Sequence, residues 1–153
     1  MIVRPMVAAD IAELAQWMVA VPLWQRYGLT VSGITRQFEA AIATQGQLYV
    51  AECDAGCCGF AWMLPLGGFG RSPYLKQIGV HPQFTGKQIG AALLEHVEQQ
   101  ARNYGKHLFL LVSDFNLDAQ RFYKRQGYQQ VGTIPAYVLP DVAELIFCKA
   151  LAQ

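Results

Sequence analysis

The chain has 153 residues, of which 53% are hydrophobic and 15% charged, and its formal net charge is +1. This composition excludes a disordered chain, and the length suits a single domain over residues 1–153. Scattered basic residues disfavour nucleic-acid binding, and no apolar run reaches the roughly 18–20 residues that span a bilayer.

The first third of the chain predicts one strand and two helices. We expect a strand at Ile2 to Pro5 and a helix opening at Asp10, where apolar residues follow at helical spacing. The segment from Pro22 to Gly28 interrupts the helical pattern. Thr30 or Ser32 then caps a second helix. Because the start also lacks the layout of a signal peptide, we expect a cytoplasmic protein.

A hairpin is predicted next. The strand-like runs Leu48 to Cys53 and Cys58 to Leu66 flank Asp54-Ala55-Gly56, a sequence typical of a turn. The glycine-rich run Leu66 to Gly70 predicts a flexible loop before the next strand.

The four cysteines are expected to be reduced, because no signal peptide accompanies them. They are Cys53, Cys57, Cys58 and Cys148. Paired CxxC spacing and a nearby histidine are missing, so we predict no metal site. We interpret these cysteines as small hydrophobes in the hairpin, and a nucleophilic cysteine is the weaker alternative.

The most informative segment runs from Tyr74 to Tyr128. It predicts a strand at Tyr74 to Val80, a helix opening at Gly86, a strand at His107 to Val112 and a helix opening at Asn116. Final strands are expected at Tyr128 to Ile134 and Val142 to Lys149. The whole pattern predicts a mixed α/β domain around one sheet.

The first of these two helices predicts an anion site. A strand that leads through a glycine-containing turn into a helix N-terminus directs free backbone N–H groups and a partial positive charge outward. Thr85 is the expected N-cap and Gly105 the expected stop. Gly86 permits the turn, and Gly90 leaves room for a ligand or for the sheet. On the alternative interpretation, the two glycines only shape a loop and relieve packing.

The second helix is predicted to carry the side chains of Asn116 and Tyr123 on one face. Asn116 and Tyr123 are seven residues apart, which is two turns along the same side.

These two motifs together resemble the GNAT superfamily of acyl-CoA-dependent N-acyltransferases. The family's pyrophosphate loop has the pattern Arg/Gln-x-x-Gly-x-Gly/Ala, and the matching residues here are Thr85-Gly86-Lys87-Gln88-Ile89-Gly90. Its second motif is Asn-x-x-Ala-x-x-Phe-Tyr-x-x-x-Gly-Phe/Tyr, and the chain has Asn116-Leu117-Asp118-Ala119-Gln120-Arg121-Phe122-Tyr123-Lys124-Arg125-Gln126-Gly127-Tyr128.

The resemblance implies a fold and an activity. The fold is a single GNAT-like α/β domain with a mostly antiparallel sheet of about seven strands, about four helices and a splayed cofactor cleft. The activity is transfer of an acetyl group from acetyl-CoA to a primary amine by direct attack in a ternary complex. The acceptor is a small-molecule, peptide or protein amine, and a homodimer is a further expectation. The alternative is a non-catalytic acyl-CoA-binding module, suggested by Thr85 and Gln88 in place of the usual residues.

The resemblance also assigns residues to roles. Tyr123 is the expected general acid for the departing thiolate, or otherwise a core aromatic. The Val80 N–H is the expected oxyanion donor. Asn116 binds the pantetheine arm or a water, or otherwise caps its helix. The full expected cofactor set is Ile78, Gly79, Val80, Thr85, Gly86, Lys87, Gln88, Ile89, Gly90, Ala91, Asn116 and Tyr123.

The general base stays open, because the run before the cofactor strand holds no carboxylate. Glu144, His81, Asp114 and a water-mediated route are the alternatives. Acceptor specificity is expected from Trp17 to Tyr27 and from two further segments, Gly67–Arg71 and Pro135–Asp141.

Overall fold

The computed structural model describes all 153 residues. Its helices are α1 (Ile11–Met18), α2 (Pro22–Arg26), α3 (Val31–Ala43), α4 (Ile89–Ala101) and α5 (Leu117–Arg125), with 3₁₀ helices η1 (Ala8–Asp10) and η2 (Pro82–Phe84). Its strands are β1 (Ile2–Pro5), β2 (Gln47–Cys53), β3 (Gly56–Gly68), β4 (Ser72–Val80), β5 (His107–Ser113), β6 (Gln129–Ile134) and β7 (Glu144–Ala150).

The seven strands form one sheet in the order β1-β2-β3-β4-β5-β7-β6. The pairs β1–β2, β2–β3, β5–β7 and β6–β7 are antiparallel, whereas β4 and β5 are parallel. The predicted α/β class and the mostly antiparallel seven-stranded sheet are therefore confirmed. None of the helices combines the length and the apolar composition needed to span a bilayer.

One helix was not predicted. Pro22 to Gly28 was interpreted as an interruption, but Pro22 begins the five-residue helix α2. The first turn of a helix accepts proline, because the missing N–H has no intrahelical partner there and the fixed φ suits a helix. The structure thus has five α-helices instead of about four.

The chain divides into two compact units. Unit 1 comprises Met1–Met63 and Gln77–Val97, and unit 2 comprises Leu64–Lys76 and Glu98–Gln153.

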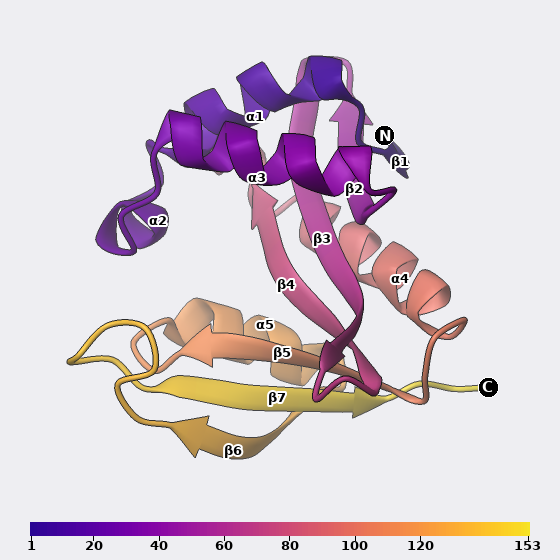
Figure 1. Cartoon of the computed structure of the whole chain (residues 1–153), viewed down its shortest axis with the longest axis vertical. Coiled ribbons are helices and arrows are strands. Elements are labelled where there is room, and N and C mark those ends of the chain that lie inside the picture. Colours follow the sequence, from indigo (N-terminus) through magenta and orange to yellow (C-terminus); the bar gives the residue numbers. More distant parts are fainter. The chain divides into compact units, whose positions relative to one another are not determined.

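In unit 1, α1 and α3 lie side by side (Figure 1). Most of the apolar residues predicted at helical spacing are buried, among them Leu14, Met18 and Phe38, whereas Ala41 and Ile42 of α3 are half-buried. Phe38 packs edge-on against Phe60 of β3, with ring centroids 5.5 Å apart. Thr30 caps α3 as predicted, since its hydroxyl oxygen accepts the Gly33 N–H at 3.1 Å.

A buried carboxylate ties β1 to the start of α1. Both Asp10 oxygens accept hydrogen bonds from the Arg4 guanidinium at 2.9 Å, and one also accepts the Val7 N–H at 2.8 Å. The hydrogen bonds from Arg4, opposed by burial, hold the pKa of Asp10 below its ordinary value. The ionised carboxylate is therefore the form that the fold stabilises.

We expect Asp10→Asn to lower the free energy of unfolding at pH 7 by roughly 1–3 kcal/mol, because charge-assisted bonds are replaced by weaker ones. A folded-state pKa below the unfolded value of about 3.9 stabilises the fold above that pH. The difference between wild type and variant should therefore shrink as the pH falls through the folded pKa. Urea unfolding at several pH values measures it, with exposed Glu39→Gln on α3 as the control. A difference that is the same at pH 3 and pH 7 contradicts this account.

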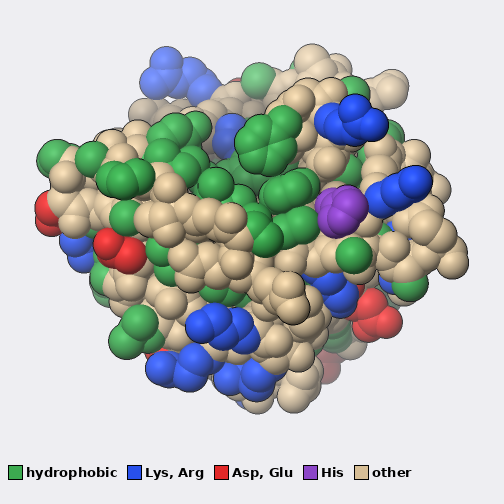
Figure 2. Space-filling view, turned by 90° about the horizontal axis from the view of Figure 1, so that it is seen from below, with side chains coloured by type: hydrophobic (Ala, Val, Ile, Leu, Met, Phe, Trp, Pro, Cys, Tyr) green, Lys and Arg blue, Asp and Glu red, His purple; other side chains and the backbone are tan.

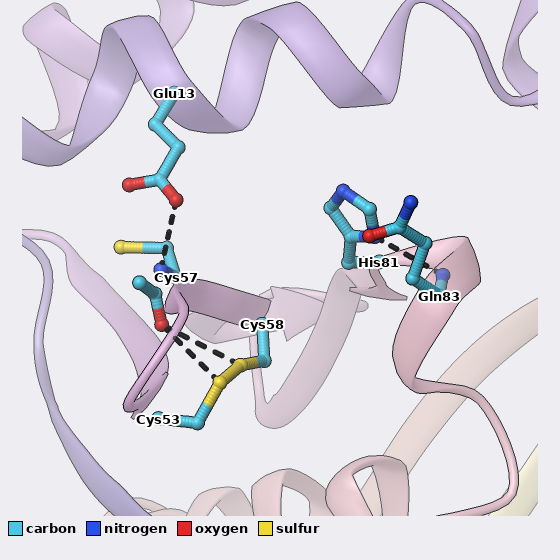
Figure 3. Close-up of a disulfide and its surroundings, with 7 residues drawn as sticks. Glu13, Cys53, Cys57, Cys58, His81 and Gln83 are labelled. Carbon is cyan, nitrogen blue, oxygen red and sulfur yellow. Dashed lines mark hydrogen bonds between the residues drawn. A yellow bond between two sulfur atoms is a disulfide. The ribbon is translucent and has the colours of Figure 1, made fainter.

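The β2–β3 hairpin corrects the expectation that all cysteines are reduced. Cys53 and Cys58 form a disulfide across the turn, with Cα atoms 6.2 Å apart (Figure 3). The hairpin holds the two backbones within the range that a disulfide spans. Cys57 and Cys148 are free. Burial raises the pKa of Cys57 to about 12, which disfavours the nucleophilic thiolate.

The glycine-rich run also differs from the prediction. Leu66 to Gly70 was expected to be a flexible loop, but β3 extends to Gly68. Phe69 and Gly70 have φ values of 61° and 68°, and the Arg71 N–H donates to the Gly68 carbonyl at 3.0 Å. Successive left-handed residues make a tight hairpin turn whose twist matches the strands it joins.

In unit 2, α5 packs on one side of β5, β7 and β6 (Figure 1). Glu98 is buried there, where it accepts hydrogen bonds from the Tyr128 hydroxyl at 3.0 Å and from Lys149 at 2.8 Å. Phe69 is exposed and packs edge-on against Phe109, with ring centroids 5.3 Å apart. Figure 2 views the molecule from the side on which β6 lies and shows hydrophobic side chains gathered there, with lysine and arginine around them.

Candidate functional site

The loop before α4 has a geometry that keeps its residues out of the helix. Gly86 and Gln88 have φ values of 77° and 65°, and α4 begins at Ile89. The prediction that the helix opens at Gly86 with Thr85 as N-cap is therefore wrong, because left-handed residues cannot continue a right-handed helix. The Thr85 hydroxyl instead donates to the Pro82 carbonyl at 3.2 Å.

This loop leaves a row of backbone donors without partners. The first hydrogen bond into α4 runs from the Ala92 N–H to the Gln88 carbonyl at 3.1 Å. The N–H groups from Gly86 to Ala91 have no acceptor within the protein. Lys87 adds a positive charge, its amine lying 5.5 Å from the Phe84 ring centre. Successive free N–H groups at left-handed residues and a helix N-terminus form a concavity that suits an anion.

The helix stop also lies earlier than predicted. Gly105 was the expected stop, but α4 ends at Ala101. The N–H groups of Tyr104 and Gly105 both donate to the Ala101 carbonyl, at 2.9 and 3.1 Å, so turns rather than helix connect α4 to β5.

The end of β4 lies against aromatic side chains. The His81 N–H, just past Val80, donates to the Cys58 carbonyl at 2.8 Å. A side chain at Gly79 would collide with the Trp24 ring, and its Cβ would lie 2.9 Å from Phe60. Gly79 is thus required for packing in unit 1 as well as being a predicted cofactor residue.

Four rings form an aromatic cluster, defined as Trp17, Trp24, Phe60 and His81. The Trp17 ring centre lies 6.1 Å from those of Trp24 and Phe60, and 5.4 Å from that of His81. The predicted acceptor segment, Trp17 to Tyr27, therefore contributes two rings beside the end of β4, and all four belong to unit 1.

Asn116 caps α5 in unit 2. Its side-chain oxygen accepts the Ala119 N–H at 3.2 Å, so the capping alternative from the sequence is confirmed. A role of Asn116 toward a cofactor stays a prediction.

Tyr123 lies inside unit 2, with 6% of its surface exposed. Its ring contacts Phe122, Tyr128 and Phe147, with centroid separations between 5.2 and 6.3 Å. Burial, and then the nearby Tyr74 hydroxyl, raise the pKa of Tyr123 above its ordinary value of 10.0. The phenol therefore stays protonated at neutral pH, as a proton donor must.

A second tyrosine links Tyr123 to a carboxylate in the same unit. Burial, followed by the charges of Tyr137 and Glu144, raises the pKa of Tyr74 to about 12. Tyr74 lies opposite Phe109 in the β4–β5 pair, and Glu144 lies opposite Ser113 in the β5–β7 pair. Glu144 is 6% exposed. Tyr74 was not predicted as a site residue, because only the pairing of β4 with β5 brings it near residues that lie far along the chain.

The three side chains considered as general base have different environments. His81 Nδ1 accepts the Gln83 N–H at 3.1 Å, as Figure 3 shows, so it serves η2 as a cap. The Asp114 carboxylate accepts the Ala143 N–H at 3.1 Å, and the Asp114 N–H donates to the Ala143 carbonyl at 2.9 Å. Asp114 thus holds a turn. Glu144 is buried, and its charge acts on the Tyr74 hydroxyl.

The predicted residues fall into two groups. Ile78 to Ala91 lie in unit 1, on the end of β4, the loop and the first turn of α4. Asn116 and Tyr123 lie in unit 2. Ile89 is buried, so only its backbone is available to a ligand. No three His, Cys, Asp or Glu side chains lie close enough together to hold a metal ion.

The chain is similar to known proteins both in sequence and in fold. Residues 11–128 match the model of the acetyltransferase (GNAT) family. The chain is 39% identical over 57 residues to aminoalkylphosphonate N-acetyltransferase of Salmonella typhimurium, a match that covers 37% of each protein. The chain therefore spans well under half the length of this curated relative.

The fold is similar to that of solved acetyltransferases. Ribosomal-protein-alanine N-acetyltransferase from Brucella melitensis has a TM-score of 0.82 at 20% identity, with 99% of this chain and 100% of that chain covered. Aminoglycoside 6'-N-acetyltransferase complexed with coenzyme A has a TM-score of 0.81 at 15% identity, with 100% and 98% covered. At these identities the likeness concerns the fold alone.

Proposed function

Because the chain belongs to the GNAT family of acetyltransferases, we propose that it transfers the acetyl group of acetyl-CoA to a primary amine by direct attack in a ternary complex. The observation that carries the proposal is the row of unpartnered N–H groups from Gly86 to Ala91. A pyrophosphate needs several donors and positive charge, and this loop offers both. The names of the similar proteins include a small molecule and a ribosomal protein as acceptors, so both kinds of amine are candidates.

The loop and β4 hold the cofactor in this proposal. The N–H groups of Gly86 to Ala91 bind the pyrophosphate, and Lys87 adds charge. Backbone groups of Ile78 to Val80 bind the pantetheine arm, and the Val80 N–H stabilises the negative charge that develops on the thioester oxygen. Acetyl-CoA supplies the acetyl group as a thioester. A single catalytic domain, a cytoplasmic location and a homodimer stay predictions.

Glu144 is proposed as the general base. An alkylammonium with a pKa of about 10.4 must lose a proton before it attacks, which costs roughly 4–5 kcal/mol at neutral pH. In this proposal Glu144 takes this proton; its charge acts on the Tyr74 hydroxyl, in the unit that also holds Tyr123. Glu144 is buried in the same unit as Tyr74 and Tyr123, which supports the assignment.

Tyr123 is proposed as the general acid. The new C–N bond forms as the C–S bond breaks, the nitrogen releases its second proton to solvent as the amide forms, and the departing thiolate takes the Tyr123 proton. A thiol of pKa about 8.5 is more acidic than a phenol of pKa about 10, and burial raises the pKa of Tyr123 further, so this transfer requires prompt replacement of the phenol proton. Tyr74 is a candidate route by which the phenol proton is replaced. Its hydroxyl acts electrostatically on Tyr123, and the charge of Glu144 acts on it in turn.

Thiol release from acetyl-CoA over a panel of primary amines tests the activity. The proposal expects release that depends on both substrates, together with CoA binding in calorimetry. Binding of CoA without turnover on any amine would favour the alternative, a non-catalytic acyl-CoA-binding module. Failure to bind CoA would overturn both.

We expect Gly90→Glu to weaken CoA binding by roughly tenfold to a hundredfold, because its carboxylate would meet the pyrophosphate at the positive end of α4. Calorimetry with CoA on the folded variant measures the effect. Gly90→Ala, which adds no charge, is the matched control and should bind far more tightly than Gly90→Glu. Equal affinity of wild type and Gly90→Glu would place the cofactor elsewhere.

A further inference from the structure

Trp17 carries a donor that the fold leaves unused. Its indole Nε1 is buried and has no hydrogen-bond partner, and the side chain as a whole is 7% exposed. A buried N–H without a partner is costly, and native proteins seldom retain one unless something else supplies the acceptor. The indole N–H therefore indicates a missing oxygen or other acceptor atom.

The neighbours of Trp17 place this donor near the end of β4. Trp24, which packs against Trp17, lies directly on Gly79, and His81 follows Val80. In the proposed function, the backbone around Val80 holds the thioester. The donor thus belongs to the same unit as the residues proposed to hold the reacting end of the cofactor, and its ring cluster packs against Gly79.

The surroundings also restrict what the acceptor atom is. The other rings of the cluster are those of Trp24, Phe60 and His81. Beside these rings a carboxylate would lose its hydration at a high cost, whereas a neutral carbonyl loses much less. The site therefore suits a neutral carbonyl oxygen attached to an apolar body.

We propose that Trp17 is a specificity residue for the amine acceptor, and that its indole N–H donates a hydrogen bond to a carbonyl oxygen near the reacting amine. The acceptor class is then an α-amino carbonyl compound with an apolar side chain, such as an amino ester or the first residue of a peptide. This inference rests on the proposed function.

Access to the Trp17 nitrogen requires a ring to move, because the nitrogen is covered. Trp24 is carried by the five-residue helix α2, the shortest of the α-helices. An acceptor atom can therefore reach the Trp17 nitrogen only when one of the rings packed around it is displaced.

Two amines that differ at the carbonyl test the inference. Phenylalanine methyl ester and 2-phenylethylamine share the ring and the primary amine, and only the first has the oxygen. We expect Trp17→Phe to reduce the preference for the ester, measured as the ratio of kcat/KM values, by roughly tenfold. Turnover of 2-phenylethylamine and the KM for acetyl-CoA should change little, because the ring is replaced by another ring.

Trp62→Phe is the matched control. Trp62 is a buried tryptophan of β3 in unit 1 that packs on Phe38, with centroids 5.7 Å apart, and this variant should keep the wild-type preference. An equal loss with both amines in Trp17→Phe would make Trp17 a packing residue and overturn the inference. Turnover of other amines but of neither probe would overturn the acceptor class. Absence of thiol release with every amine would instead overturn the proposed function, and this inference with it.

Discussion

Tyr123→Phe should lower kcat by roughly 10²–10⁴-fold while leaving the KM for acetyl-CoA nearly unchanged. Phenylalanine keeps the ring contacts with Tyr128 and Phe147 and removes only the proton donor. Without that donor, the thiolate must leave unprotonated or wait for a proton from water. Steady-state kinetics with thiol detection measure the change, and a thermal melt checks that the buried ring still supports the fold.

The pH profile separates proton donation from packing. A general acid is lost as it ionises, and burial raises the pKa of Tyr123 above 10.0. Wild type should therefore keep its activity beyond the pH at which an ordinary phenol ionises and lose it at more alkaline pH. Tyr123→Phe should show no such loss of activity at alkaline pH. Tyr104→Phe, at a partly exposed tyrosine of unit 2, is the control and should match wild type. If Tyr123→Phe matched wild type in both rate and profile, Tyr123 would be a packing residue.

Glu144→Gln should lower kcat/KM for the amine by roughly 10²–10⁴-fold at pH 7, because glutamine has nearly the same shape but accepts no proton. The loss should shrink as the pH approaches the pKa of the amine, since a growing fraction of the acceptor is then neutral without help. Kinetics with one amine between pH 7 and pH 10 measure how far the kcat/KM values of Glu144→Gln and wild type approach each other.

Controls distinguish a base from a structural carboxylate. Asp118→Asn removes a solvent-exposed carboxylate from α5 in the same unit and should leave the rate unchanged. CoA affinity should be the same in wild type and Glu144→Gln, because the base acts on the amine. A loss that stays constant over the whole pH range would mean that Glu144 takes no proton, and a water-mediated route would replace it.

Local sequence patterns determined most of the architecture. Apolar residues at strand and helix spacing predicted all seven strands and four of the five α-helices, because each pattern reflects which face of an element is buried. The caps at Thr30 and Asn116 were also predictable, since a capping side chain bonds to its own helix. The family resemblance of the segment Ile78 to Tyr128 depends on the same short-range order.

Features that need a backbone torsion or a partner distant in sequence were mispredicted or missed. Left-handed torsions at Gln88 and Phe69, two residues other than glycine, moved the start of α4 and closed the β3–β4 turn. No propensity scale predicts such torsions, because the surrounding structure imposes them. The Cys53–Cys58 disulfide likewise depends on the strand pairing that brings both backbones together.

Only the tertiary structure shows how the environments of the candidate catalytic residues differ. In the sequence, Glu144, His81 and Asp114 were equivalent as bases, because a side chain's hydrogen bonds and burial are set by elements far along the chain. Folding gives His81 and Asp114 local partners and buries Glu144. It also leaves the Trp17 indole N–H without a partner, since the rings packed around it offer no acceptor in reach. Burial and hydrogen-bond satisfaction depend on the whole fold, so residue spacing predicted the candidate residues, and only packing determined how buried each of them is.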